Sequence, residues 1–227
     1  MKFFTPASAR LVQVLYLIMN IMNTILFTIL GYLSGSVLYS RLYSTLFHTG
    51  DTSAKSDDGN PGAFNAFKNG GLVCGIFVLL GDLFKAFLPV YFYLMLTEAD
   101  IAKYGIAVVM WAPVFGHLFP LFYHFRGGKG IAASFGSLLA LWAAQVSAIP
   151  VLTLAALFLF FKLIIQVRPD FYLTGLVFLL LPAFCWMGHV SLIVLLGTLL
   201  ISASVLLRLS ASREERPVLE VSLLWKH

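Results

Sequence analysis

Long apolar stretches dominate the chain, and short polar intervals separate them. The first, Leu11 to Leu38, has 28 residues and would form a helix about 42 Å long, more than the roughly 30 Å of a hydrocarbon layer requires. Two further apolar runs cover residues 72–96 and 104–122, and residues 131–207 can supply four more. The pattern predicts an all-α polytopic membrane protein with about seven transmembrane helices, organised as one domain over residues 1–227.

The polar intervals differ in length and composition. Residues 39–71 combine several charged side chains with Gly and Ser, so we expect a long loop there. Residues 123–130 carry three glycines around one lysine and form a second conspicuous loop, whereas residues 97–103 read as a short polar turn. Because long or glycine-rich loops often carry function, the first two are predicted to be functional loops.

The amino-acid composition supports a membrane protein and limits the ligands and partners to be expected. The chain is 60% hydrophobic and 11% charged with a mean hydropathy of +0.92, which excludes a water-soluble fold. Its net charge of +5 is compatible with membrane topology and anionic ligands, so no nucleic-acid partner is expected. Cys74 and Cys185 both lie in apolar runs and read as small buried hydrophobic residues, and no metal or cofactor is predicted.

The basic residues indicate an orientation. If the N-terminus lies outside, twelve of the 15 Lys and Arg residues fall on or toward the inner side, leaving only Lys2, Arg10 and Lys103 outside. The C-terminus and both functional loops are then cytoplasmic. The first apolar run is much longer than the apolar region of a signal peptide, so we expect it to remain as a membrane helix.

The glycine-rich segment has the features of an anion site. Glycines let backbone N–H groups approach an anion, Lys129 adds a positive charge, and a helix beginning directly afterwards adds a favourable dipole. A Walker A motif is excluded because Gly130 follows Lys129 where Ser or Thr is required. The candidate phosphate-binding residues are Arg126, Gly127, Gly128 and Gly130 with Lys129. A flexible basic turn is the equally weighted alternative.

The first loop contains a second group of polar candidates. Asn60 and Asn65 flank a turn that includes Gly62, and their amides can orient a ligand with hydroxyl groups. Lys68 can neutralise the charge of such a ligand. An ordinary Pro-Gly turn between membrane helices is the alternative.

Asp82 and Lys85 lie three residues apart on one face of an apolar run. Ionisable residues within a membrane span are rare and usually functional, although a structural ion pair is the alternative. Lys85 is therefore a candidate phosphate ligand, and Asp82 and His117 are candidate supporting residues.

Three motifs, together with Gly35-Ser36, carry a family resemblance: Asn60-Pro-Gly-Ala-x-Asn65, Asp82-x-x-Lys85 and Gly116-His-x-Phe-Pro … Phe125-x-Gly-Gly-Lys-Gly-Ile-Ala132. In order and spacing, residues 31–132 resemble the bacterial acyl-phosphate:glycerol-3-phosphate acyltransferase family. The resemblance implies a multi-pass enzyme of the bacterial inner membrane, active in phospholipid synthesis. Its implied partners are acyl phosphate, glycerol 3-phosphate and membrane lipid, and its implied product is lysophosphatidic acid.

This chain departs from the family pattern at several site positions. Asp58 and Lys68 stand where the family has Ser and Arg, Phe64 replaces a Thr, and the His and Asn expected after Arg208 are missing. The resemblance implies catalytic roles for Asp58, Lys68 and Lys129. A carboxylate at position 58 can accept the proton of the attacking hydroxyl, but it also repels phosphate. A catalytically inactive descendant that binds lipid or phosphate is the alternative function.

Overall fold

The computed structural model describes residues 6–50, 60–97, 99–211 and 218–223, with side chains omitted at 6–9 and 99–103. Helices make up almost all of this part of the chain. They are α1 Pro6–Gly35, α2 Tyr39–Leu46, α3 Ala63–Leu96, α4 Ala99–Leu118, α5 Ile131–Ala143, α6 Ile149–Leu159, α7 Asp170–Met187 and α8 Leu192–Ser210. A 3-10 turn, η1 Leu121–Tyr123, follows α4, and a π-helical turn, η2 Phe160–Ile164, extends α6. Strand β1 Val167–Arg168 pairs antiparallel with β2 Glu220–Val221.

The prediction of a helical membrane protein is confirmed. By length and apolar composition, five helical segments are able to cross a membrane: 10–35, 63–96, 104–123, 170–187 and 192–210. Helix α5 and the combined α6–η2 segment are apolar but shorter. With 13 residues, α5 is about 20 Å long at ~1.5 Å per residue, less than the hydrocarbon thickness. The count of seven spans therefore stays a prediction.

Two predicted loops are partly helical. Within the predicted loop at 39–71, α2 forms and α3 begins at Ala63, because Tyr39 and Tyr43 of α2 pack their rings on Phe77 of α3. The predicted turn at 97–103 is also too long, since α4 begins at Ala99.

Helix α3 is interrupted by a kink at Gly71, whose φ is 81°. The second apolar run begins directly after this kink.

Shorter shifts affect two other boundaries. The first apolar run was predicted to extend to Leu38, but α1 ends at Gly35. The third was predicted to end near Phe122, but α4 ends at Leu118 and Pro120 separates it from η1. A proline cannot donate a backbone hydrogen bond, so it favours this break. Four spans were predicted between residues 131 and 207; four helices, α5 to α8, lie there, and α7 and α8 are the ones with the length of a candidate membrane span.

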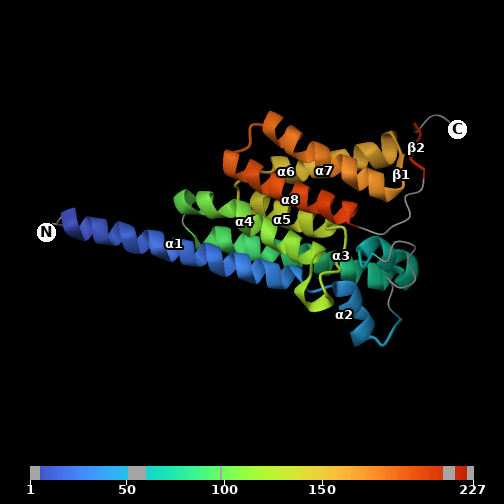
Figure 1. Cartoon of the computed structure of the whole chain (residues 1–227), viewed down its shortest axis with the longest axis horizontal. Coiled ribbons are helices and arrows are strands. Elements are labelled where there is room, and N and C mark those ends of the chain that lie inside the picture. Colours follow the sequence, from blue (N-terminus) through green and yellow to red (C-terminus); the bar gives the residue numbers. More distant parts are fainter. Residues whose placement is uncertain (1–5, 51–59, 98, 212–217, 224–227) are drawn as a thin grey trace.

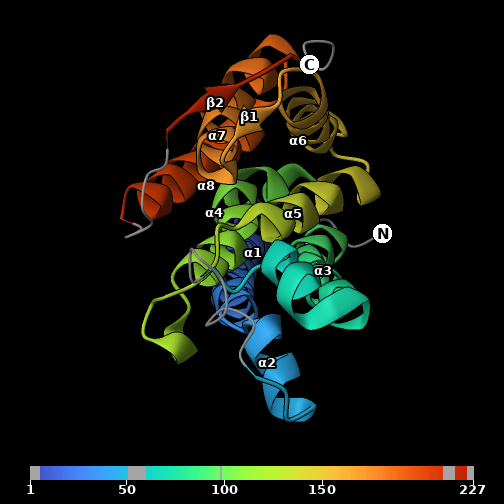
Figure 2. The same cartoon turned by 90° about the vertical axis from the view of Figure 1, so that its right-hand side faces the viewer.

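The long helices run in alternating directions and form a bundle (Figure 1). Viewed from one end, α4 and α5 lie between α6, α7 and α8 on one side and α1 and α3 on the other (Figure 2). Small residues allow the closest helix contacts: a Cβ on Gly35 of α1 would overlap the carbonyl of Pro113, and a Cβ on Gly136 of α5 would overlap that of Leu83. These contacts hold α1 on α4 and α3 on α5.

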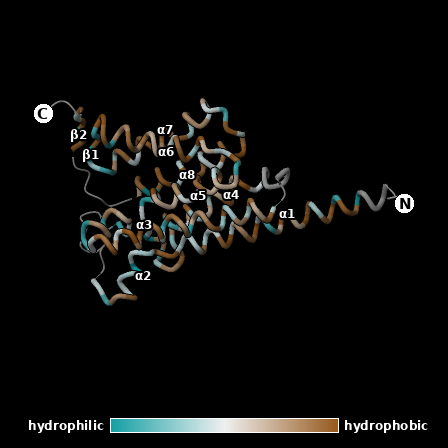
Figure 3. The backbone as a smooth tube through the Cα atoms, turned by 180° about the vertical axis from the view of Figure 1, so that it is seen from behind, coloured by the Kyte–Doolittle hydropathy of each residue, from teal (hydrophilic) through white to brown (hydrophobic). Residues whose placement is uncertain are grey.

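Both predicted functional loops lie at the same end of the bundle. In Figure 1 the α1–α2 connection, the segment between α4 and α5, and the end of α8 share this end, and the N-terminus lies at the opposite end. The helices are mostly hydrophobic along their length, with a hydrophilic stretch at the start of α3 (Figure 3). The fold therefore gathers the polar chemistry of distant segments at one end of an apolar bundle.

Candidate functional site

A cavity of about 370 Å³ lies between α3 and α5 and is lined by both polar and apolar side chains. Its polar lining comes from Asn60, Asp82, His117 and Lys129. Its apolar lining comes from Leu79, Leu83, Phe135, Leu139 and Val151. A molecule with a charged head and a hydrocarbon chain fits such a mixed lining, because the cavity offers both polar and apolar contacts.

Two helix N-termini reach the cavity. Gly62 is the N-cap of α3 and Gly130 is the N-cap of α5, and both residues line the cavity. The first N–H groups of a helix lack acceptors within the helix and carry its positive dipole end. Gly130 has a φ of 81°, in the left-handed region that favours glycine. Lys129 adds a full positive charge beside these groups, so the cavity favours anions.

The glycine loop is built differently from the sequence-based expectation. The N–H of Gly127 donates to the carbonyl of Leu118 over 3.2 Å, and the N–H of Gly128 donates to the carbonyl of His117 over 3.1 Å. The prediction that these two N–H groups bind phosphate is therefore corrected, since both are engaged inside the protein. Glycine is required here for space, because a Cβ at either position would overlap an atom of His117.

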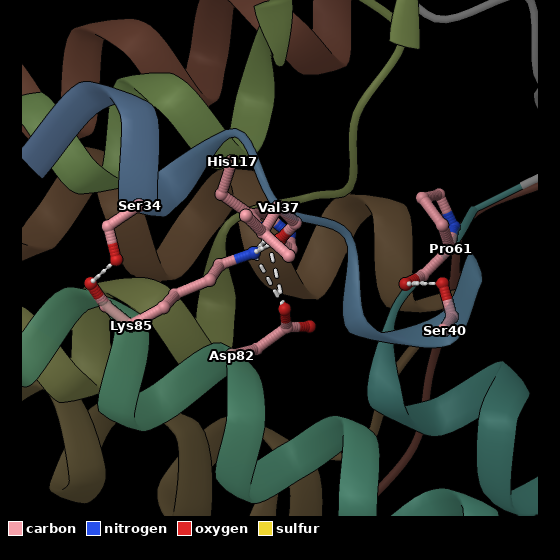
Figure 4. A network of polar contacts seen from close by, with 7 residues as sticks. All are labelled: Ser34, Val37, Ser40, Pro61, Asp82, Lys85 and His117. Carbon is pink, nitrogen blue, oxygen red and sulfur yellow. Dashed lines mark hydrogen bonds and ion pairs between the residues drawn. The ribbon is translucent and has the colours of Figure 1, made fainter. Parts of the chain in front are cut away.

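Asp82, Lys85 and His117 form a buried cluster (Figure 4), and Asp82 and His117 also line the cavity. The Nζ of Lys85 lies 2.7 Å from Asp82 Oδ1, 2.8 Å from His117 Nδ1 and 2.6 Å from the carbonyl oxygen of Val37. His117 Nδ1 and Asp82 Oδ1 are 3.5 Å apart. An ammonium group has three donors, and these partners use all three. The prediction of Lys85 as a phosphate ligand is corrected on this ground.

The asparagine loop is held by its own hydrogen bonds. Asn65 is buried and donates from Nδ2 to the carbonyl of Asn60 over 2.9 Å, so it shapes the loop. The hydroxyl of Ser40 in α2 donates to the carbonyl of Pro61 over 2.9 Å. Helix α2, which sequence reasoning did not predict, therefore fixes the segment that brings Asn60 to the cavity.

The structure brings together only part of the predicted site. Of the predicted residues, Asn60, Gly62, Asp82, His117, Lys129 and Gly130 line the cavity. Lys68 and Arg126 are exposed and do not appear among the described lining residues. Asp58 lies outside the described residues, so its predicted catalytic role stays a prediction.

Sequence reasoning missed the role of Arg208 and the apolar lining of the cavity. Arg208, in the last turn of α8, donates from Nη2 to the carbonyl of Gly127 over 2.8 Å. No local pattern indicates this contact, since it joins segments far apart in the chain. The apolar lining did leave a signal, because Leu79 and Leu83, like Phe135 and Leu139, are four residues apart on one helix face.

Comparison with known proteins identifies relatives of this chain. A family model described as glycerol-3-phosphate acyltransferase matches residues 25–215. The chain is 46% identical over 77 residues to a glycerol-3-phosphate acyltransferase of Haemophilus ducreyi, covering 34% of this chain and 37% of the relative. It is 42% identical over 89 residues to one of Paraburkholderia phytofirmans, covering 37% of this chain and 39% of the relative. These matches thus span less than half the length of the curated relatives.

The fold also matches solved structures. A crystal structure of PlsY, an integral membrane glycerol 3-phosphate acyltransferase, in its glycerol 3-phosphate form superposes with a TM-score of 0.66. The match covers 82% of this chain and 87% of PlsY at 24% sequence identity. The lysophosphatidic acid form gives a TM-score of 0.65. Since the family model spans most of the sequence and the fold agrees, the chain belongs to the glycerol-3-phosphate acyltransferase family.

Proposed function

We propose that this protein transfers an acyl chain from acyl phosphate to glycerol 3-phosphate and releases lysophosphatidic acid and inorganic phosphate. The observation that carries the proposal is the mixed lining of one cavity, which combines two helix N-termini and Lys129 with hydrocarbon side chains of α3 and α5. Both substrates carry a phosphate, and the donor also carries a long hydrocarbon chain.

The reaction needs positioning more than strong acid–base chemistry. Acyl phosphate is an activated mixed anhydride: a glycerol hydroxyl attacks its carbonyl carbon, the new ester C–O bond forms, and the bond to phosphate breaks. The hydroxyl proton leaves with the phosphate or with a nearby base. Alignment and stabilisation of the developing oxyanion therefore account for most of the rate enhancement.

The cavity residues divide into three tasks under this proposal. Lys129 and the first N–H groups of α5 bind one phosphate, and the start of α3 with Asn60 binds the other. The apolar side chains between α3 and α5 receive the acyl chain. With the site in the cell membrane and its loop end facing the cytoplasm, as the basic residues predict, glycerol 3-phosphate enters from the cytoplasm.

A transfer assay on the protein in lipid bilayers tests the proposal. We expect product with acyl phosphate as donor and none with acyl-CoA, and we expect Lys129→Ala to lower kcat/KM by about tenfold or more through loss of a charge-assisted phosphate contact. Lys162→Ala is the matched control, because Lys162 is half exposed and pairs with Asp170 outside the cavity. A rate for Lys129→Ala equal to that of the control would contradict the assigned phosphate site.

A catalytically inactive relative is the second candidate, favoured by one observation. Phe64 is 63% exposed and lines the cavity, at a position where the family resemblance implies a hydroxyl side chain. If the wild-type protein binds glycerol 3-phosphate but transfers no acyl group from any donor, this binding function replaces the enzymatic one.

A further inference from the structure

His117 connects the buried cluster to the cavity through the two nitrogens of one ring. Its Nδ1 contacts Lys85 and Asp82, while its Nε2 side packs over Gly128, where a Cβ would overlap Nε2. The side chain is 3% exposed and lines the cavity. Within the part of the chain that the structure describes, no residue forms a hydrogen bond with Nε2.

The partners of Nδ1 determine where the ring carries its proton. Lys85 Nζ lies 2.8 Å from Nδ1 and 2.7 Å from Asp82 Oδ1, so Asp82 holds the amine as an ammonium. An ammonium can only donate hydrogen bonds, so Nδ1 must accept and the ring proton must be on Nε2. With this protonation the net charge of the buried cluster is zero, since the Lys85 ammonium and the Asp82 carboxylate lie beside a neutral imidazole.

We propose that His117 is a neutral imidazole with its proton on Nε2, and that it donates a hydrogen bond to a phosphoryl oxygen of the bound ligand. Lys85 and Asp82 are positioning residues that hold this tautomer. The proposal deepens the proposed function, because it takes the phosphate ligands from it and adds a directional, uncharged donor to the cationic site.

The orientation of the ring depends on three separate segments. Lys85 is fixed by the carbonyl of Val37, at 2.6 Å, in the connection between α1 and α2. Its own carbonyl accepts from the hydroxyl of Ser34 at 2.8 Å. The carbonyl of His117 accepts from the N–H of Gly128 at 3.1 Å. The imidazole ring and the glycine loop are therefore already ordered before a ligand enters. Binding then costs less conformational entropy.

Removal of the lysine is expected to reverse the tautomer. In Lys85→Met, the ammonium donor is absent and Asp82 Oδ1, 3.5 Å from Nδ1, is the nearest polar partner. A carboxylate can only accept, so Nδ1 would take up the proton and Nε2 would become an acceptor facing the phosphate. We expect phosphate affinity to fall by about tenfold or more, because a donor is replaced by a repelling lone pair.

A protein with one histidine makes the tautomer measurable. His48, His124 and His189 are exposed and have positive φ, so asparagine, which tolerates this conformation, is the suitable replacement at each. With His227→Asn added, only His117 remains. Nitrogen-15 NMR of this histidine-labelled protein in lipid bilayers, with and without inorganic phosphate, distinguishes a bare from a protonated ring nitrogen.

The expected spectrum has a bare Nδ1, a protonated Nε2, and an Nε2 resonance that shifts when inorganic phosphate is added. Lys85→Met in the same background should exchange the two assignments. A protonated Nδ1 in the unsubstituted Lys85 protein, a doubly protonated ring, or an Nε2 resonance that phosphate leaves unchanged would each overturn the proposal. If the spectrum is as expected but the wild-type protein transfers no acyl group, only the proposed enzymatic function fails.

Discussion

Arg208 and Gly127 lie 81 positions apart in the chain, yet Arg208 Nη2 donates to the carbonyl oxygen of Gly127 over 2.8 Å. The same glycine uses its N–H to contact the carbonyl of Leu118. The loop is thus held by the end of α8 from one direction and by the end of α4 from the other. Lys129, two residues later, is placed at the cavity by this double anchoring.

Replacement of Arg208 should loosen the loop while the bundle stays folded. For Arg208→Met we expect kcat/KM for glycerol 3-phosphate to fall by about 10- to 100-fold, equivalent to the roughly 1.5–3 kcal/mol of a charged hydrogen bond. Steady-state kinetics check this result. Arg168→Met is the control, because Arg168 is exposed in β1. Equal kinetics for the two variants would show that the Arg208 contact does not position the loop.

Gly128→Ala should displace the ring of His117. The added methyl would overlap Nε2, so we expect phosphate affinity to fall by roughly tenfold, as for loss of a polar contact in the site. Gly175→Ala is the matched control, since its Cβ would meet only Leu209 Cδ1 at 3.8 Å, an ordinary contact. Binding of inorganic phosphate, measured calorimetrically, tests this. Unchanged affinity in a folded Gly128→Ala protein would contradict the close packing.

A larger side chain in the apolar part of the cavity should shorten the preferred acyl chain. Leu139→Trp fills space between α3 and α5, and each methylene that is excluded costs about 0.8 kcal/mol, or roughly fourfold in kcat/KM. Rates with a series of acyl phosphates of increasing length check the shift. Leu152→Trp is the control, because Leu152 is exposed on α6. A preference identical to wild type would place the acyl chain elsewhere.

The Ser and Arg that the family resemblance implies at positions 58 and 68 can be introduced in place of Asp58 and Lys68 to test the roles of these two residues. We expect the double variant Asp58→Ser with Lys68→Arg to preserve or raise the transfer rate, since serine removes a repelling carboxylate and arginine can bind phosphate through two parallel hydrogen bonds. If Asp58 instead acts as the base, Asp58→Ser alone should lower kcat by about 10² to 10⁴. Transfer assays on the single and double variants separate these outcomes.

The orientation in the membrane can be measured with reporters. Because twelve of 15 basic residues sort to one side, a reporter fused after His227 should be active only in the cytoplasm, and one placed before Met1 only outside. Activity of the C-terminal reporter on the outer side would reverse the orientation and move the cavity to that side.

The sequence alone determined the membrane class, the positions of most helices and the segments that carry polar chemistry. A bilayer requires backbone hydrogen bonds to be satisfied within each spanning segment, so apolar runs of this length indicate helices. Polar residues such as Asn60, His117 and Lys129 are conspicuous in this apolar background, and the cavity indeed contains them. Helix α2 was missed because its stability comes from ring packing on Phe77, which local periodicity does not reveal.

Only the tertiary structure decided what each polar group contacts. The sequence cannot distinguish a lysine that faces phosphate from one that faces a carboxylate, and Lys85 turned out to be of the second kind. Likewise, the N–H groups of Gly127 and Gly128 are used by carbonyls of the preceding segment. Arg208 reaches Gly127 from another helix. These partners belong to segments that are remote in the chain. A hydrogen bond forms only when the fold brings its donor and acceptor atoms within about 3 Å of each other.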